Sequence, residues 1–182
     1  MRLDLKLVEQ WVKPDTRVLD LGCGDGELLA HLRDNFSVHG YGIEIDADRI
    51  TGAISRGVNV IQQDLNVGLG NFRNDSFDTV IMTQALQAVE KPDVLLEDML
   101  RVANEAIITF PNFAHWAARF YLTLKGRMPV SEALPYTWYN TPNIHLCTFH
   151  DFDALCAAKG ITVLDRIAVD GGQQGSVLAR LF

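Results

Sequence analysis

The feature that most constrains the fold is a glycine-rich stretch, at residues 17–29 (RVLDLGCGDGELL), that joins an apolar run to a helical pattern. The apolar run ends in Asp20, and glycines follow at Gly22, Gly24 and Gly26. This order predicts a strand, a tight turn and a helix N-terminus, which is the local geometry of a nucleotide-type site in an open α/β sheet. We expect Asp20 at the carboxyl end of its strand, facing the crevice where such sheets bind ligands.

The spacing of the glycines distinguishes two classes of ligand. A dinucleotide fingerprint, G-x-G-x-x-G, would need its third glycine at position 27, which is Glu27. The pattern acid-x-G-x-G-x-G instead resembles motif I of the class I S-adenosylmethionine (SAM)-dependent methyltransferases. An acid at position 20 suits the sulfonium and ammonium of SAM better than the anionic pyrophosphate of a dinucleotide. As pure structure, the same turn would be only a tight connection between a strand and a helix.

Short apolar strands alternate with helical patterns along the chain. Strands are predicted at 17–21, 38–46, 58–61, 77–82, 106–110, 161–169 and 176–182. Helices are predicted at 4–12, 26–34, 47–56, 92–102, 113–124 and 149–159. This alternation predicts a doubly wound, mostly parallel sheet, and Gly171-Gly172 permits an antiparallel hairpin at the end. The succession resembles the seven-stranded class I methyltransferase fold, as a single domain over residues 1–182.

Composition excludes several classes of protein. The chain has 182 residues, 48% of them hydrophobic, and this is enough for one domain with a real core. It has no apolar run of about 18 residues, so no membrane span or membrane partner is expected. Charges within residues 1–6 argue against a signal peptide, so we expect a cytoplasmic location. The net charge of −7, without a Lys/Arg stripe, argues against nucleic acid as a partner.

The three cysteines show no C-x-x-C spacing; they are Cys23, Cys147 and Cys156. We therefore expect them to be ordinary free thiols in a reducing compartment, and we expect neither a set of disulfide bonds nor a metal site.

Acids at the ends of the next two strands extend the candidate SAM site. Glu44 lies within the ~20-residue interval expected for a ribose-binding acid, although it can also be a solvated strand-end acid. A carboxylate there can accept hydrogen bonds from both hydroxyls of a vicinal diol. Asp64 matches the family position that accepts from the adenine amino group, with the Leu65 backbone nearby; a turn cap is the alternative. The expected cofactor-binding set for SAM or S-adenosylhomocysteine (SAH) is Asp20, Gly22, Cys23, Gly24, Gly26, Glu44, Ile45, Asp64, Leu65 and Thr83.

Catalytic residues are not evident from the sequence. The polar stretch 83–87, after the fourth strand, can contact the methionine moiety or a substrate, or cap the next helix. The Asn-Pro-Pro-Tyr motif of amino-methylating enzymes is absent, and residues 111–113 echo it only superficially. His115 has the chemistry of a base near neutral pH, but such a histidine is more often packed or on the surface. The catalytic residues therefore remain unassigned.

The stretch 126–148 is expected to be irregular because prolines at 129, 135 and 142 exclude a regular helix. It carries residue types that are enriched at interfaces, namely Arg127, Met128, Tyr136, Trp138 and Tyr139. Three interpretations stay open: a lid over the ligand crevice, a docking surface, and an irregular cover on the sheet.

Several motifs together resemble the MetW family of methionine-biosynthesis proteins. They are DLGCGDG (20–26), YGIEID (41–46), SFD (76–78), QALQA (84–88), FPNF (110–113), GRMPV (126–130) and WYNTPNIH (138–145). The resemblance covers nearly the whole chain, and its last two motifs are far more specific than the glycine turn. It implies a methyltransferase fold and a role beside MetX, the homoserine O-acyltransferase of methionine synthesis. It implies no particular methyl acceptor.

Two functional hypotheses follow from these observations. The first is a SAM-binding partner that supports the acyltransferase and senses SAM, the end product of the pathway. The second is a SAM-dependent methyltransferase that acts on a small molecule. A chain of 182 residues leaves little room for a separate substrate domain, which favours the first hypothesis. The sequence leaves the oligomeric state open.

Overall fold

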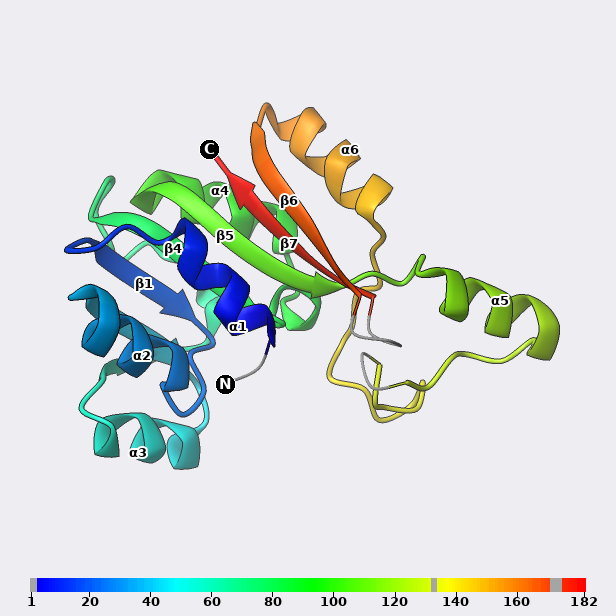
Figure 1. Cartoon of the computed structure of the whole chain (residues 1–182), viewed down its shortest axis with the longest axis horizontal. Helices are drawn as coiled ribbons and strands as arrows, with labels where there is room; N and C mark the ends of the chain where they lie inside the picture. Colours follow the sequence, from blue (N-terminus) through cyan, green and yellow to red (C-terminus); the bar gives the residue numbers. More distant parts are fainter. Residues whose placement is uncertain (1–2, 132–133, 171–174) are drawn as a thin grey trace.

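A seven-stranded sheet lies at the centre of the molecule in the computed structural model of the chain, which describes residues 3–131, 134–170 and 175–182 (Figure 1). Its strands are β1 (Arg17–Leu21), β2 (His39–Glu44), β3 (Asn59–Gln62), β4 (Phe77–Thr83), β5 (Ala103–Pro111), β6 (Val163–Asp170) and β7 (Gly175–Leu181). Their order across the sheet is β3-β2-β1-β4-β5-β7-β6. The first five strands pair in parallel, whereas β7 is antiparallel to both β5 and β6. The predicted fold class is therefore confirmed.

Helices connect the strands at nearly the predicted positions. They are α1 (Leu3–Val8), α2 (Glu27–Phe36), α3 (Ala47–Ser55), α4 (Pro92–Val102), α5 (Trp116–Lys125) and α6 (Phe149–Lys159), with short 3-10 turns η1 (Glu9–Trp11), η2 (Leu65–Val67) and η3 (Leu86–Ala88). Over the residues that the structure describes, no helix has the length and apolar character to cross a membrane.

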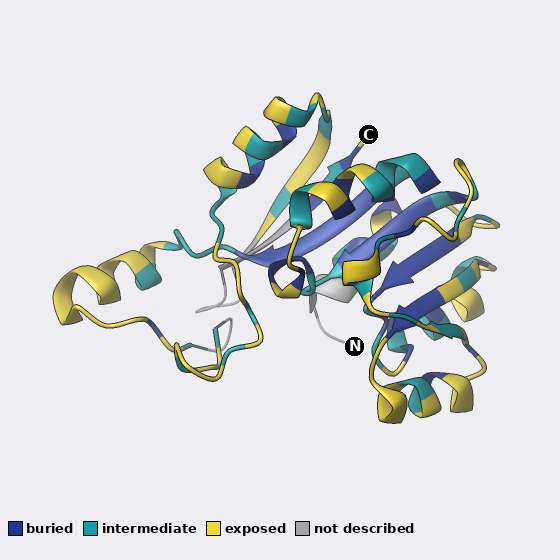
Figure 2. Ribbon diagram, turned by 180° about the vertical axis from the view of Figure 1, so that it is seen from behind, coloured by how far each residue is buried: buried dark blue, intermediate teal, exposed yellow. Residues whose placement is uncertain are grey.

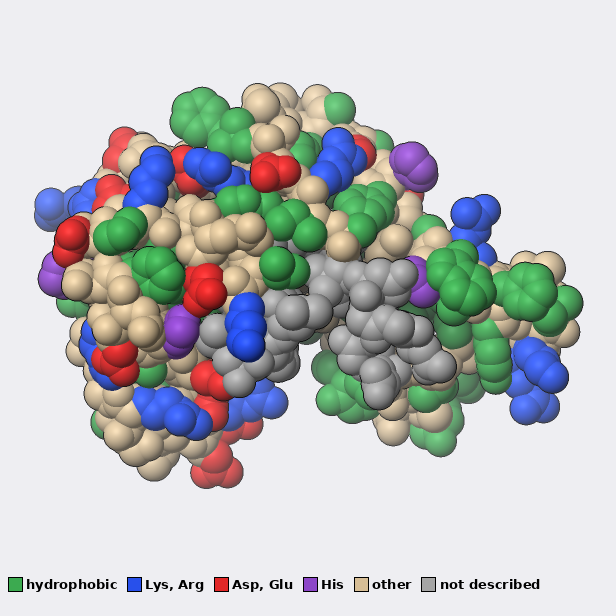
Figure 3. Space-filling view, viewed as in Figure 1, with side chains coloured by type: hydrophobic (Ala, Val, Ile, Leu, Met, Phe, Trp, Pro, Cys, Tyr) green, Lys and Arg blue, Asp and Glu red, His purple; other side chains and the backbone are tan. Residues whose placement is uncertain are grey.

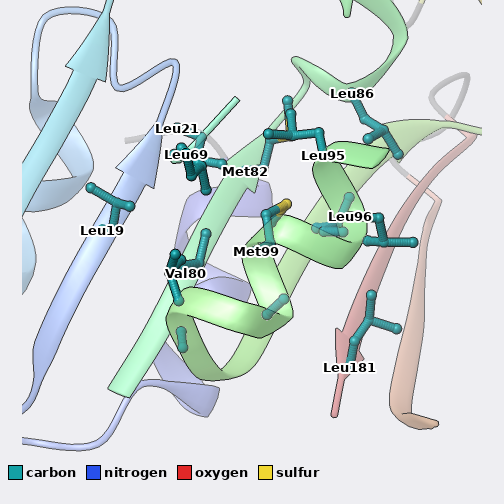
Figure 4. Close-up of a cluster of buried hydrophobic side chains, with 14 of the residues drawn as sticks. Leu19, Leu21, Leu69, Val80, Met82, Leu86, Leu95, Leu96, Met99 and Leu181 are labelled. Atoms are coloured by element: carbon teal, nitrogen blue, oxygen red, sulfur yellow. The ribbon is translucent and has the colours of Figure 1, made fainter. Parts of the chain in front are cut away.

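Two apolar layers hold the helices against the sheet, one on each face. Successive buried residues of a strand point to opposite faces, so Val80 and Met82 of β4 join one layer while Ile81 joins the other. The first layer packs β4 and β5 against α4 and α6. The labelled side chains of Figure 4 show the part of this layer between β1, β4 and α4. The second layer packs the sheet against η1, α2 and α3. Burial on both faces explains why the central strands are continuous apolar runs.

The strand order places a switch point between β1 and β4. From β1 the chain runs to β2 and β3 on one side, and then crosses to β4 and β5 on the other. The connections that leave the carboxyl ends of β1 and β4 therefore diverge, and this opens a crevice at that edge of the sheet. The glycine turn follows β1 directly, so it borders this crevice.

Three predicted boundaries differ from the structure or lie outside its described part. β5 begins at Ala103 rather than at residue 106, and Glu105 within this extension is bound by Arg180 of β7. α5 begins at Trp116 rather than at residue 113, because Asn112–His115 form a turn in which the His115 N–H donates to the Asn112 carbonyl, 3.1 Å away. The predicted hairpin turn at Gly171-Gly172 lies outside the described residues.

Residues 112–148 form an arm that leaves the sheet after β5 and returns to it at α6. The described part of the predicted irregular stretch, 126–131 and 134–148, contains neither helix nor strand. Figures 1 and 2 show the arm at the end of the molecule opposite to α2 and α3.

Candidate functional site

The glycine turn is built as the sequence predicts, at the carboxyl end of the central strand β1. Asp20 lies near that end and is 1% exposed. The three glycines adopt positive φ angles, +74° at Gly22, +57° at Gly24 and +75° at Gly26, which a residue with a Cβ rarely adopts. The N–H groups of Gly22 and Cys23 donate to the Ile43 carbonyl at 2.8 and 3.0 Å, and so attach the turn to β2.

Two of these glycines also allow a close approach of the chain. A Cβ on Gly26 would lie 3.0 Å from the Ala53 Cβ of α3, and one on Gly22 would lie 3.3 Å from the Ala85 Cβ that follows β4. A Cβ on Gly24 would meet only the Arg49 guanidinium, at 3.9 Å. The turn is therefore packed tightly at both ends, and its middle leaves room for a ligand against the main chain.

Glu44 binds the glycine turn in addition to ending β2. Its side chain is buried, and one carboxylate oxygen, Oε2, accepts from the N–H of Gly24 at 2.9 Å. The other, Oε1, accepts from the N–H groups of Ile45 and Asp46 at 2.8 and 3.0 Å. An ionised carboxylate has about four acceptor positions, so three are already in use. The sequence indicated a ligand-binding acid here, but not this second, structural role.

Cys23 is a buried thiol and not a nucleophile. Burial, together with the nearby charges of Asp20 and Glu44, raises the pKa of the Cys23 thiol to about 12. Since the thiolate is the reactive form, the side chain is inert near neutral pH. It packs so closely against β2 that a Cβ on Gly42 would overlap its sulfur. Burial likewise raises the pKa of Cys147 and of Cys156 to about 11, and all three cysteines are free thiols.

The other predicted contacts lie at the ends of β2 and β3. Asp64 is exposed and caps η2, with Oδ1 accepting from the Asn66 N–H at 2.9 Å, so the alternative weighed from the sequence is present. Leu65 packs against the core, whereas Ile45 is exposed. The Gln63 N–H donates to the Glu44 carbonyl at 3.0 Å, which holds these two strand ends side by side.

The connection after β4 carries two features that the sequence did not reveal. Thr83 ends the strand, and Gln84 then takes a φ of +56°, uncommon for a residue with a side chain. Gln87 is 3% exposed as a whole residue. Neither the nitrogen nor the oxygen of its side-chain amide has a hydrogen-bond partner among the described residues. Buried amides are nearly always paired, and strained backbone gathers at functional sites. These features set residues 83–87 apart from the regular structure around them.

His115 lies in the arm, apart from the glycine turn. It precedes α5 and lines a hollow of about 210 Å³ together with Asn112, Tyr121 and Ser131. Its ring centroid is 5.7 Å from that of Trp116. The structure therefore does not bring this histidine to the strand ends where the other candidates gather. Within the described residues, no three His, Cys, Asp or Glu side chains form a group that could hold a metal ion.

Comparisons with known proteins agree with this geometry. The family model described as "Methionine biosynthesis protein MetW" matches residues 2–182. A curated relative from Rhodopirellula baltica, the "Bifunctional methionine biosynthesis protein MetXA/MetW", is 36% identical over 185 residues. The alignment covers 96% of this chain and 30% of the relative, so the chain spans less than a third of that protein.

Solved structures share the fold at low sequence identity. The magnesium protoporphyrin IX methyltransferase of Synechocystis, solved with bound SAH, has a TM-score of 0.72 and 19% identity, over 97% of this chain and 78% of that one. The [4+2]-cyclase SpnF has a TM-score of 0.73 and 17% identity, over 97% and 79% of the two chains. The class I SAM methyltransferase type of fold is thereby established for this chain.

Proposed function

The chain belongs to the MetW family of methionine-biosynthesis proteins, and from this premise we propose that it is a SAM-binding partner of a MetX-type homoserine O-acyltransferase. The observation that carries the proposal is the Rhodopirellula baltica relative, whose name assigns both MetXA and MetW to one polypeptide. Covalent linkage gives two modules a high effective concentration, which benefits modules that must associate. In this proposal residues 1–182 act as one domain in the cytoplasm.

SAM or SAH would bind at the crevice between β1 and β4. Asp20 and the three glycines of the turn would hold the amino-acid part of the ligand, with Thr83 at the opposite wall. Glu44 and Ile45 would contact the ribose, and Asp64 and Leu65 the adenine. The residues present fit such a ligand, because the middle of the turn is open at Gly24 and an acid at the strand end complements a sulfonium. The methyltransferase of the same fold with bound SAH supports the assignment.

Glu44 gives this site a specific consequence. With three backbone N–H donors on its carboxylate, about one acceptor position remains for a ribose hydroxyl. A second ribose bond requires one backbone donor to leave, and the Gly24 N–H is the donor that comes from the glycine turn, since Ile45 and Asp46 directly follow Glu44 in the chain. Binding of the ribose and the conformation of the glycine turn are coupled through this one carboxylate.

A supporting role fits the site better than catalysis does. SAM, when bound, supplies an electrophilic methyl group, and some acceptors then need a base. The Cys23 thiol stays protonated, and His115 lies in the arm. The fold alone leaves the reaction open, since a protein described as a [4+2]-cyclase shares it. The second candidate, a SAM-dependent methyltransferase of a small molecule, rests on the same ligand site.

One experiment separates the two candidates. The acyltransferase is co-purified with this protein, with and without SAM, and its activity is measured in both states. In parallel, SAM with a labelled methyl group is incubated with the protein and with the metabolites of the pathway. We expect association and no label transfer. Label transfer to a metabolite, without association, would establish the methyltransferase instead.

A further inference from the structure

The arm, residues 112–148, is the largest feature that the ligand site does not use. Its helix α5 has no buried residue over its ten positions, unlike the helices α2, α4 and α6 that pack on the sheet. A helix with large exposed apolar side chains is expected to have a partner, because a helix is stabilised mainly by tertiary packing of its apolar face.

The apolar side chains of α5 form a continuous ridge. Trp116, Phe120 and Leu124 are spaced four residues apart, so they lie on one side of the helix, and they are 71%, 62% and 65% exposed. Ridges of large exposed apolar side chains mark interaction sites on soluble proteins. Trp116 and Phe120 also belong to the residue types that carry binding energy at interfaces.

A second apolar surface faces the end of this helix. An open hollow of about 670 Å³ lies between α5 and the returning chain, lined by Tyr121, Arg127, Met128, Val130, Trp138 and Tyr139. Trp138 and Tyr139 meet edge to face, with ring centroids 5.7 Å apart, and both are exposed. The aromatic residues singled out in the sequence thus continue the surface of α5. The sequence placed docking in 126–148 alone, and the structure extends it to the helix before this stretch.

The arm is held in its conformation by hydrogen bonds to the body and within itself. The N–H groups of Ile144 and His145 both donate to the Gln87 carbonyl, at 2.8 and 3.0 Å. At its root, the Phe113 N–H donates to the Cys147 carbonyl at 3.1 Å. A surface ordered before it binds loses less entropy on docking, which favours affinity.

The charge of the arm is opposite to that of the whole chain. Between residues 112 and 148 the sequence has three basic residues and one acid, whereas the chain carries a net charge of −7. Arg119, Lys125 and Arg127 are all exposed, and blue and green side chains cover the arm on the face seen in Figure 3. The arm therefore suits a partner whose surface is apolar and acidic.

A second copy of this chain fits the arm poorly. In a two-fold dimer the same patch meets itself, so basic side chains would face basic side chains. Docking of the arm onto the acidic body of another copy would be head-to-tail and would continue into a filament or ring. The MetXA/MetW relative carries its other module in the same polypeptide, and this points to that module as the occupant.

We propose that the ridge of α5 and the adjoining hollow dock the homoserine O-acyltransferase through an apolar, acidic face of that enzyme. This inference rests on the proposed function and names the surface that performs it. The ridge supplies the aromatic anchors, and the basic residues accelerate the encounter.

The test is a binding measurement between the full chain and the purified acyltransferase of the same organism, by calorimetry at low and high salt. Phe120→Ala should weaken association about 30-fold, in keeping with a central aromatic anchor. Arg119→Glu should weaken association at low salt and reduce its salt dependence. Ile54→Ala on α3 and Arg73→Glu before β4 are matched controls, because both side chains are exposed on the body. Both controls should bind as the wild type does.

The outcomes distinguish this inference from the proposed function. If the wild type binds and both arm variants bind equally well, the docking surface lies elsewhere and the partnership stands. If the wild type does not bind, both proposals are overturned. Two further measurements address other occupants: sedimentation with vesicles that contain phosphatidylglycerol, and the oligomeric state. Phe120-dependent vesicle binding or self-association, without an effect on the acyltransferase, would assign the arm to a membrane or to a second copy.

Discussion

Replacing Glu44 with glutamine tests whether this carboxylate anchors the glycine turn. The carboxylate accepts from Gly24 through one oxygen and from Ile45 and Asp46 through the other. A glutamine has a single side-chain oxygen, so in either orientation its NH2 group faces at least one backbone N–H. Glu44→Gln therefore loses at least one hydrogen bond and places the glutamine NH2 group, a donor, next to a backbone N–H, also a donor. The hydrogen bonds that remain no longer have a charged acceptor.

The magnitude follows from the environment of these bonds. Hydrogen bonds to charged groups contribute about 1.5–3 kcal/mol each, and a buried donor left unpaired costs about 1–3 kcal/mol. We expect Glu44→Gln to lower the free energy of unfolding by about 3 kcal/mol. For a protein of this length, such a loss lowers the midpoint of thermal unfolding by about 6–12 °C.

Thermal unfolding without ligand, followed by circular dichroism, gives the midpoint, and calorimetry with SAH gives the affinity. We expect both to fall, the affinity by about 10- to 100-fold. Glu90→Gln makes the same chemical change at an exposed site and should alter neither. An unchanged midpoint for Glu44→Gln would refute the anchoring role, and an unchanged affinity for SAH would refute the role in ligand binding.

Three further predictions concern other parts of the structure. The bidentate Arg180 guanidinium lowers the pKa of the Glu105 carboxyl, so this pair stabilises the fold above the unfolded pKa and is lost as the pH falls through the folded one. Glu105→Gln should thus cost about 2 kcal/mol at pH 7, and in urea titrations this cost should shrink as the pH falls below about 4 and vanish only below the folded pKa. Gly42→Ala should destabilise the protein by about 1–3 kcal/mol through overlap with the Cys23 sulfur, and Cys23→Ala should restore part of this in the double variant. Gln87→Met removes an unpaired buried amide and should raise stability by about 1–2 kcal/mol, measured by thermal unfolding.

For each of these three predictions, one specific result would contradict it. A pH-independent effect of Glu105→Gln would mean that the ion pair does not form in solution. Additive effects of Gly42→Ala and Cys23→Ala would mean that the two side chains do not collide. A loss of stability in Gln87→Met would show that the amide is hydrogen-bonded in solution.

Local patterns were sufficient to predict the sheet, because each central strand is a short apolar run bounded by turn residues. The glycine turn could equally be predicted from the sequence, since positive φ angles at three alternating positions favour glycine. The first residues of β5 were missed because Ala103–Glu105 is not an apolar run. They pair with Phe77–Thr79 of β4, and Glu105 accepts a hydrogen bond from Arg180, which lies 75 residues further along the chain. No local window contains such a contact.

The candidate site was predicted less completely than the fold. Residue type and spacing placed acids at three strand ends, and the structure has them there. Spacing does not show what a side chain binds, so the three backbone bonds to Glu44 became visible only in three dimensions, whereas the cap that Asp64 makes on η2 was one of two alternatives in the sequence. The exposure of α5 could not be predicted from the sequence either. A helix that packs its apolar residues on the sheet and one that leaves them exposed have the same periodicity of apolar residues.

The segment after β4 explains how a ligand site and a docking arm can belong to one mechanism. Ala85 lies against the glycine turn at Gly22, and two residues later the Gln87 carbonyl holds the returning arm. The positive φ of Gln84 and the unpaired amide of Gln87 place two unfavourable features in this same segment. Such features persist when the surroundings enforce them, and they are relieved when a bound state supplies new partners. If ligand and acyltransferase prefer the same arrangement of this segment, linkage requires each to raise the affinity of the other by the same factor. Under the proposed function, SAM bound at the strand ends would then change the affinity for the acyltransferase without a second SAM site on this chain.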